Sequence, residues 1–349
     1  MLKYIAKRTL YGLLVLLGVV ILVFFLFQGF GDPSRLVMGQ STDSTTQANI
    51  RKELYLDQPK WKQFIHYLND VSPICFHSSE EINRKKLKGI FIGGHNKFGL
   101  KIPYLRNSYQ SKRGVWNILM QALPGTLMLA FAAMFIAMLL GIPLGVLAAT
   151  RQNTWVDTTV IFSSIVGISA PSFFMGIIMV YIFGFMLSDW TGLHIAGSWF
   201  AIDEETGARR LTLQNLILPA ITLGIRPLAI ITQLTRSAML DVLDQDYIRT
   251  AYAKGLSKKR VIWKHGLRNA LNPVITAITG WFAELLAGAF FVEYIFGWQG
   301  IGKVTVDALE KLDYPVVMGA VLLSATFFII INILADILYG VVDPRVRIN

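Results

Sequence analysis

Cysteine is almost absent from this sequence, and charged residues are scarce. The 349 residues include one cysteine, Cys75, so no disulfide can form within the chain. Only 16% of the residues are charged, whereas soluble domains have about 25%. Hydrophobic residues make up 54%, above the roughly 45–50% of soluble domains. These proportions exclude an internal disulfide framework and indicate an integral membrane protein.

Catalytic and metal-binding patterns are also lacking. The sequence contains no Ser/His/Asp set, no HExxH motif and no pair of intramembrane aspartates, so it offers no catalytic set for a membrane protease or lipid enzyme. His66, Cys75 and His77 are loosely spaced, without a CxxC or HxxxH pattern, and do not predict a metal site. We therefore expect no enzyme activity, no bound cofactor and no metal.

Long uncharged runs are the main feature that is present. The first follows Lys3, Lys7 and Arg8 and is long enough to cross a hydrocarbon core, which needs about 20 residues. A cleaved signal peptide is the alternative, but this run exceeds an h-region of roughly 7–15 residues. The predicted spans are 9–31, 114–150, 158–188, 211–239, 269–292 and 314–342.

Proline and glycine mark expected breaks and close contacts in these spans. Pro171 predicts a break in the third span, and the Arg226-Pro227 pair predicts an interruption of the fourth. Gly141 and Gly145 have the spacing that lets two helices approach closely in a bilayer.

The distribution of positive charge favours one orientation. The net charge is +11, and excess Lys and Arg in a membrane protein usually lie in cytoplasmic loops, so a nucleic-acid partner is not expected. The two short outer loops hold only Arg209, Arg210, Lys303 and Lys311. The short inner segments hold Lys3, Lys7, Arg8, Arg151, Arg236, Arg249, Lys254, Lys258, Lys259, Arg260, Lys264, Arg268, Arg345 and Arg347. Both termini are therefore expected in the cytoplasm.

Residues 32–113 form a long polar outer loop in this topology. Its most basic cluster contains Arg84, Lys85, Lys86 and Lys88, and we expect these side chains to be solvated. A loop longer than about 60 residues crosses the membrane largely regardless of its charge, so this cluster does not contradict the orientation.

A basic segment on the inner side, 246–273, interrupts the apolar spans. Residues 246–254 predict a short helix, Gly255 breaks it, and Ser257 is suited to cap a second helix that reaches Lys264. The segment is either an orientation signal or a docking element whose apolar side chains enter a groove of a partner. The apolar side chains expected to dock are Ile248, Ala251, Leu256, Val261 and Ile262.

Three further features concern charge and nucleotide binding. Glu284, midway through the fifth span, and Arg226 are costly intramembrane charges and are candidates for a translocation pathway. Gly297, Gly302 and Lys303 match part of a phosphate-binding loop, but Val304 replaces the required Ser or Thr. This match also follows a membrane span instead of a strand, so we expect no nucleotide site here.

Several motifs occur together and in order: KRTLYGLL at the start, SAPSFFMGI, RTAYAKGL at 249–256, FGWQGIGKV, DYPVVMGAVLL and DILYGVVDPRVR. With these motifs the chain resembles the permease subunits of bacterial ABC importers, in the dipeptide/oligopeptide/nickel branch. Residues 249–256 look like that branch's version of the cytoplasmic EAA loop, which docks onto ATPase subunits. Arg249-Thr250-Ala251 stands where the general pattern has Glu-Ala-Ala, so contact details from other branches do not carry over.

The resemblance implies an all-α membrane protein with six transmembrane helices, the ABC type I importer permease fold and a long extracytoplasmic loop after helix 1. Residues 1–113 would form the first helix and this loop, and 114–349 a five-helix core that carries the coupling loop 246–273. The residues implied in ATPase coupling are Tyr247, Arg249, Thr250, Ala251, Lys254, Gly255 and Leu256.

The resemblance also implies a function and partners. The chain would form half of an inner-membrane pathway for small peptides, nickel or another small solute. Its expected partners are membrane lipid, a second similar permease, two cytoplasmic ATPases that hydrolyse ATP, and an extracytoplasmic solute-binding protein. The alternative from another class is a membrane receptor or scaffold that recruits a cytoplasmic partner through its basic loop. A secondary transporter is disfavoured because no paired interrupted helices recur in two halves.

Overall fold

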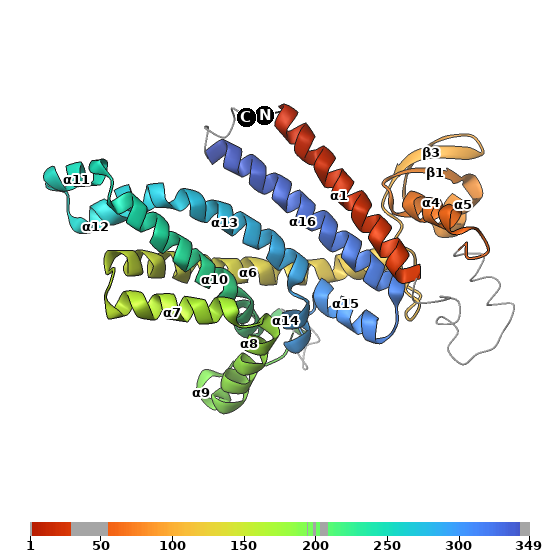
Figure 1. Cartoon of the computed structure of the whole chain (residues 1–349). Coiled ribbons are helices and arrows are strands. Elements are labelled where there is room, and N and C mark those ends of the chain that lie inside the picture. The colour runs from red at the N-terminus through yellow and green to blue at the C-terminus, as the bar shows by residue number, and fades with distance from the viewer. Residues whose placement is uncertain (1, 29–54, 194, 198–199, 203–208, 343–349) are drawn as a thin grey trace. The chain divides into compact units, whose positions relative to one another are not determined.

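The computed structural model describes residues 2–28, 55–193, 195–197, 200–202 and 209–342 (Figure 1). Residues 29–54 of the predicted outer loop and the tail with Arg345 and Arg347 lie outside the described residues. The chain divides into two compact units: Met1–Gly12, Leu123–Lys303 and Thr326–Asn349 form the first, and Leu13–Ala122 with Val304–Ala325 form the second.

Long helices dominate the described chain. Four are apolar and long enough to cross a membrane: α1 (Leu2–Gln28), α6 (Val115–Thr150), α10 (Gln214–Leu243) and α16 (Tyr314–Val342). A bent pair of helical segments, described below, makes five if it is counted as one span. Helix α13 (Leu267–Gly288) occupies most of the predicted fifth span, but over its described residues it is not among the helices that meet this criterion. The expectation of a mostly helical membrane protein is confirmed.

Shorter helical elements connect the long ones. They are α7 (Trp155–Ser169), α8 (Ser172–Met179), the π-helix η1 (Val180–Met186), α9 (Ser188–Thr191), α11 (Asp246–Ala253), α12 (Lys258–Arg260), the π-helix η2 (Val261–Gly266), α14 (Phe290–Ile295) and α15 (Ile301–Glu310). A two-stranded hairpin of β4 (Phe200–Ile202) and β5 (Arg209–Leu211) precedes α10.

The predicted helix breaks have different outcomes. Pro171 stands at the N-cap of α8, and the segments 155–169 and 172–186 are bent by 108°, so the predicted break is confirmed. The predicted interruption at Pro227 is wrong, because α10 continues through both Pro219 and Pro227. Membrane helices tolerate proline where neighbouring groups satisfy the freed backbone carbonyl, and Pro227 is buried within the first unit.

Helices α6 and α10 pack closely through glycine. A Cβ at Gly145 would collide with the Thr235 side chain and with the Thr232 carbonyl oxygen, and one at Gly141 would crowd Ile231. Close backbone approach of this kind is what small residues at this spacing permit in a bilayer. The predicted role of the Gly141/Gly145 pair is therefore confirmed, and α10 lies directly against α6.

A buried ion pair joins α7 to α10. Arg236 Nε lies 2.5 Å from Asp157 Oδ1, and its Nη2 lies 2.7 Å from Oδ2, so the contact is bidentate. The Asp157 side chain is only 4% exposed and also accepts a hydrogen bond from the Asn153 backbone N–H. Arg236, which the sequence suggested only as an orientation charge, thus holds two helices together.

The glycine-rich segment 297–303 binds a carboxylate of its own chain. Glu293, fully buried in α14, accepts hydrogen bonds from Thr126 Oγ1 at 2.7 Å and from the Lys303 backbone N–H at 3.1 Å. Thr126 Oγ1 in turn accepts from the Ile301 N–H, and Trp298 Nε1 donates to the Gly125 carbonyl. The Lys303 backbone N–H, which would be available to phosphate in a phosphate-binding loop, therefore donates to Glu293 instead. Because a helix, α14, precedes the segment, its context also differs from that of a phosphate-binding loop.

The second unit contains a small α/β subdomain that the sequence did not reveal. Its sheet consists of β1 (Ile74–Ser78), β2 (Gly89–Gly93) and β3 (Asn96–Lys101), antiparallel in the order β1-β3-β2. Helices α4 (Lys60–Val71) and α5 (Ser79–Lys85) complete it. Short strands of mixed composition give little periodic signal, which explains why they were missed.

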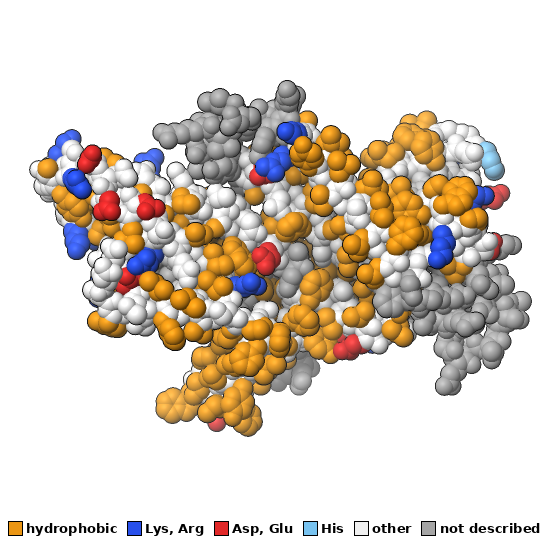
Figure 2. All heavy atoms as spheres, in the orientation of Figure 1, with side chains coloured by type: hydrophobic (Ala, Val, Ile, Leu, Met, Phe, Trp, Pro, Cys, Tyr) orange, Lys and Arg blue, Asp and Glu red, His pale blue; other side chains and the backbone are white. Residues whose placement is uncertain are grey.

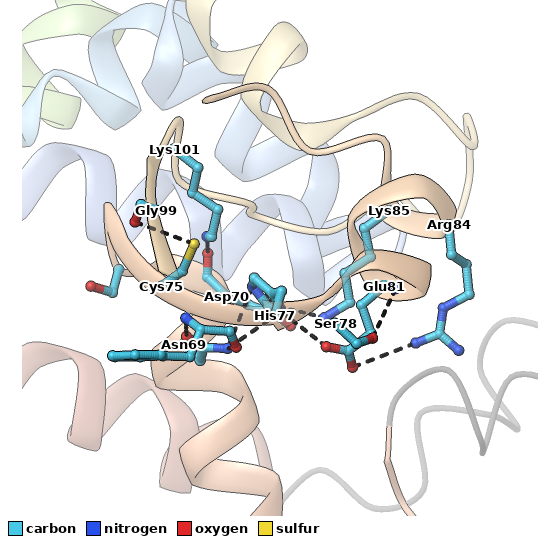
Figure 3. A network of polar contacts seen from close by, with 12 residues as sticks. Asn69, Asp70, Cys75, His77, Ser78, Glu81, Arg84, Lys85, Gly99 and Lys101 are labelled. Carbon is cyan, nitrogen blue, oxygen red and sulfur yellow. Dashed lines mark hydrogen bonds and ion pairs between the residues drawn. The ribbon is translucent and has the colours of Figure 1, made fainter. Parts of the chain in front are cut away.

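A polar network lies beneath this sheet (Figure 3). Lys85 Nζ lies 2.5 Å from Asp70 Oδ1, and Lys101 Nζ donates to the Asp70 carbonyl oxygen. His77 hydrogen-bonds to Glu81 at 3.1 Å, and this bond is the main reason that the pKa of Glu81 falls to about 2. Burial lowers the pKa of Lys101 to about 8. The expectation that Lys85 is solvated is wrong, because its charge is needed to balance Asp70.

The three residues weighed as metal ligands make other contacts in this subdomain. Cys75 is fully buried and its Sγ donates to the Gly99 carbonyl oxygen, while His66 stacks on Tyr55 with ring centroids 4.0 Å apart. His77 is bound to Glu81, as described above. Among the described residues, no group of three or more His, Cys, Asp or Glu side chains is placed to hold a metal ion.

The Arg236–Asp157 pair predicts a stability difference between two arginine variants. Arg236→Gln leaves the Asp157 carboxylate buried without its charge partner, so we expect a loss of roughly 3 kcal/mol and a lower Tm in detergent micelles. The matched control is Arg249→Gln, which removes an exposed arginine 3.5 Å from Asp246 and should leave Tm almost unchanged. Equal Tm values for the two variants would contradict a clamping role for Arg236.

A second prediction concerns the Glu293 contacts. In Glu293→Gln, one carboxylate oxygen becomes an NH₂ group that cannot accept a hydrogen bond from Thr126 or from the Lys303 N–H. The expected cost is roughly 1–3 kcal/mol, seen as a lower Tm and faster proteolysis within 297–303. Glu80→Gln, at an exposed glutamate, is the control. Wild-type proteolysis rates for Glu293→Gln would refute the assignment.

Candidate functional site

The basic segment 246–273 forms two short helices at one end of the first unit, and Figure 2 shows charged side chains gathered there. Helix α11 ends at Ala253, as the sequence predicted to within a residue. The second helix begins at α12, but it does not end near Lys264. It continues through the π-helix η2 into α13, so residues 258–288 form one continuous helical path.

Gly255 forms the turn between α11 and α12. Its φ is +77°, in the region that only glycine enters at low cost, and a Cβ built there would meet no atom within 4 Å. Glycine is therefore required by the backbone conformation and not by crowding inside this chain. Ser257 stands at the N-cap position of α12, but its side chain makes no capping hydrogen bond, so this part of the prediction is wrong. Its carbonyl oxygen accepts from the Val261 N–H instead.

Most of the apolar side chains expected to enter a partner's groove are buried against other residues of this chain. Ile248, Ala251 and Val261 form a buried cluster on which Val242 and Leu243, at the end of α10, also pack. Ile262 belongs to a second buried cluster with Val146 of α6 and Met239 of α10. That expectation is therefore wrong, since four of the five side chains are buried and Leu256 is half-buried. The clusters attach α11 and η2 to α10 and α6.

The surface left for a partner is polar and aromatic. Among the residues implied in coupling, Tyr247, Arg249, Thr250, Lys254 and Gly255 are exposed, whereas Ala251 is buried. Two hydrogen bonds secure this surface: Asn269 Nδ2 donates to Tyr247 Oη at 2.7 Å, and Thr250 Oγ1 donates to the Asp246 carbonyl oxygen at 3.0 Å. The exposed aromatics Tyr252 and Trp263 add apolar area to it. A partner that docks here would contact cations and aromatic rings, and the buried cluster attaches the helix that presents them to α10.

A separate cavity in the first unit brings together the two candidate pathway charges. Arg226 of α10 and Glu284 of α13 both line it, with Ser172, Thr222 and Trp281 among the other lining residues. The Arg226 guanidinium lies 5.4 Å from the centroid of the Trp281 ring, a cation–π contact. Both charged residues are exposed, so other parts of this chain do not bury either side chain.

Trp281 is a site residue that the sequence analysis missed. It lies three positions before Glu284 on α13, and side chains at this spacing share one face of a helix. The spacing was visible in the sequence, but the contact with Arg226 was not, because it depends on how α10 and α13 pack.

Two family models match the chain. "Binding-protein-dependent transport system inner membrane component" matches residues 141–348, and the corresponding N-terminal model matches residues 1–80. The chain is 38% identical to the di/tripeptide transport system permease protein DppB of Pseudomonas aeruginosa over 365 residues, and 37% identical to the dipeptide transport system permease protein DppB of Escherichia coli over 375 residues. It is 35% identical to the glutathione transport system permease protein GsiC of E. coli over 349 residues. In each case 99% of both chains is covered.

These matches cover the basic segment, the cavity charges and the glycine-rich segment, and they extend over nearly the whole chain. Such permeases are transport subunits of the bacterial inner membrane that cross it several times, work with ATPases and a solute-binding protein, and are not ATPases themselves. The chain belongs to the family of inner-membrane permease components of binding-protein-dependent ABC importers.

Proposed function

We propose that this chain forms half of the pathway of an ABC importer for small peptides. The observation that carries this proposal is identity of 35–38% over 99% of the chain to permeases named for dipeptides, di/tripeptides and glutathione. A second, similar permease would supply the other half. Two cytoplasmic ATPases would hydrolyse the ATP, with no cofactor bound by this chain, and a solute-binding protein would deliver the peptide.

The proposed topology has six spans, with α13 as the fifth and both termini in the cytoplasm. The excess of Lys and Arg in the segments then assigned to the inside supports this orientation. In this arrangement 246–273 faces the ATPases, and the subdomain with β1, β2 and β3 faces the periplasm.

Segment 247–264 would act as the coupling lever. Its buried cluster of Ile248, Ala251 and Val261 packs on the end of α10, and its second helix continues into α13. A push on α11 by an ATPase is therefore transmitted to the two helices that carry Arg226 and Glu284. Closely packed elements transmit such displacements because protein interiors have low compressibility.

The cavity charges suit the proposed substrate class. A free peptide carries a carboxylate at one end and an ammonium group at the other, and Arg226 and Glu284 offer the two opposite charges in one cavity. The side chain of Trp281 adds an apolar surface. We propose that these residues guide the peptide through this half of the pathway, with the partner permease completing the enclosure.

Uptake measurements test the proposed function and separate it from a scaffold. A strain that lacks this gene should lose uptake of labelled dipeptide and regain it with the wild-type gene. Loss of nickel uptake with normal dipeptide uptake would indicate that the substrate is nickel and not a peptide. The tagged chain should also bring down ATPase subunits during purification, and a protein that brings down none would favour the receptor or scaffold alternative.

Gly255→Asp is predicted to uncouple ATP hydrolysis from uptake. The backbone strain at φ +77° should tilt α11 without any clash inside the chain, so the protein should still reach the membrane. In vesicles with the ATPases and binding protein, we expect peptide uptake per ATP to fall by roughly 5- to 150-fold, the usual range of a coupling free energy.

The matched control is Gly192→Asp. Gly192 has φ +60°, and a Cβ there also meets no atom within 4 Å, but it follows α9 and lies outside the coupling segment. Its variant therefore carries comparable local strain and should keep coupled uptake. Wild-type coupling in Gly255→Asp would rule out the lever.

Glu284→Gln is predicted to alter peptide transport while the assembly remains intact. If the carboxylate attracts the peptide's ammonium group, KM for a free dipeptide should rise by about tenfold, equivalent to about 1.4 kcal/mol. KM for an N-acetylated dipeptide, which lacks that charge, should not change. Glu310→Gln, at an exposed glutamate outside the cavity, is the control. Unchanged kinetics for the free dipeptide would assign Glu284 a structural role.

A further inference from the structure

The three-stranded sheet of the second unit has an apolar face that its own helices do not cover. Along each strand, alternate side chains point to opposite faces. Cys75, His77 and Lys101 lie on the face with the polar network, and the other face carries only hydrophobic side chains at its centre. These are Ile74, Phe76, Ile90, Ile92, Phe98 and Leu100, each between 49% and 74% exposed. An exposed apolar patch of this kind indicates a binding surface.

Pairing in the sheet makes this face continuous. Ile74 lies opposite Leu100, Phe76 opposite Phe98, and Ile92 also opposite Phe98 from the other side. The Phe76 and Phe98 rings have centroids 4.8 Å apart. Figure 2 shows hydrophobic side chains over this part of the molecule. The surface is therefore one apolar platform and not a set of isolated side chains.

The subdomain is fixed at the end of a membrane span. The apolar part of α1 reaches Leu26, and Phe24 within it packs on Phe64 and Tyr67 of α4, with ring centroids 5.2 and 5.6 Å apart. Gln28 Nε2 donates to Gln63 Oε1 at 2.7 Å. Helix α4 thus lies at the level where hydrocarbon gives way to headgroups. Figure 1 shows β1 and β3 beside α4, and β1 contacts α4, so the sheet lies near the end of this span.

The charges around the platform favour an anionic lipid surface. The sequences of β1, β2 and β3 contain no Asp or Glu, and the exposed Lys86 and Lys88 directly precede β2. Residues 29–54, which lie outside the described residues, offer a poor cover, because 39–49 are almost entirely polar and the only apolar run, 36–38, is short. A lipid surface supplies both an apolar layer and phosphate groups.

We propose that this platform rests on the bilayer beside α1, with its six apolar side chains in the interfacial layer and Lys86 and Lys88 at lipid phosphates. The depth is limited to the interface because the outer edges of β1 and β2 need water or headgroups for their backbone groups. The contact would hold the subdomain against the membrane surface. This inference does not depend on the transported substrate.

Spin labelling of the full-length chain tests the contact. With Cys75 replaced by Ser, single cysteines at Ile92 or Phe98 carry a nitroxide, and one at the exposed Asn83 of α5 is the matched control. The chain is placed in nanodiscs of phosphatidylglycerol and phosphatidylcholine, alone and assembled with its partner subunits. We expect labels at Ile92 and Phe98 to collide more with oxygen than with a water-soluble nickel chelate, and the label at Asn83 to show the reverse.

Two results would overturn the proposal. Preferential collision of the Ile92 label with the nickel chelate would mean that the face is in water. Protection of that label from both reagents, alone or after assembly, would mean that protein covers it, either residues 29–54 or a partner subunit. Ile90→Glu should invert the collision ratio at Phe98 while the Asn83 label is unchanged, which excludes global unfolding.

The basic residues are tested separately. Lys86→Glu with Lys88→Glu should lower the oxygen preference of the Phe98 label in discs containing phosphatidylglycerol and leave it unchanged in discs of phosphatidylcholine alone. The same change in both kinds of disc would refute the contribution of lipid phosphates.

Discussion

Close packing of α10 against its neighbours is the constraint on which the first unit depends. Gly141 and Gly145 let α6 approach so closely that a single added Cβ would clash, and Arg236 ties α10 to α7 through a buried bidentate contact. The far end of α10 packs on the buried cluster of the coupling segment. In the proposed coupling, these contacts would transmit a displacement of α11 to α10.

Much of this arrangement could be predicted because its signals are local. Helix α16 begins at Tyr314, as the predicted span 314–342 indicated, and Pro171 and Gly255 mark breaks where backbone chemistry requires them. Hydrophobic length, proline and a glycine with positive φ act within a few residues, so the sequence displays them directly.

What could not be predicted depends on contacts between distant residues. Ile248 and Val261 look like docking residues in a polar segment, yet their partners are on α10. Lys85 sits in a run of basic residues and looks solvated, but it is buried against Asp70 of another helix. The strands of the second unit were missed for a related reason. They are short and mixed in composition, and their pairing joins residues far apart in the sequence, such as Ile74 and Leu100.

Five charged side chains in the helices of the first unit divide into two kinds according to their contacts. Asp157 and Glu293 are buried, Arg236 is half-buried, and all three are hydrogen-bonded within the chain, so each fixes one arrangement of helices. Arg226 and Glu284 line a cavity, and both remain exposed in this half of the pathway. Carrying charge in a membrane is costly, and hydrogen bonds within the chain offset that cost for the first kind, whereas Arg226 has a cation–π contact with Trp281. Under the proposed function, the second kind is also compensated from outside the chain, by the other permease or the passing solute.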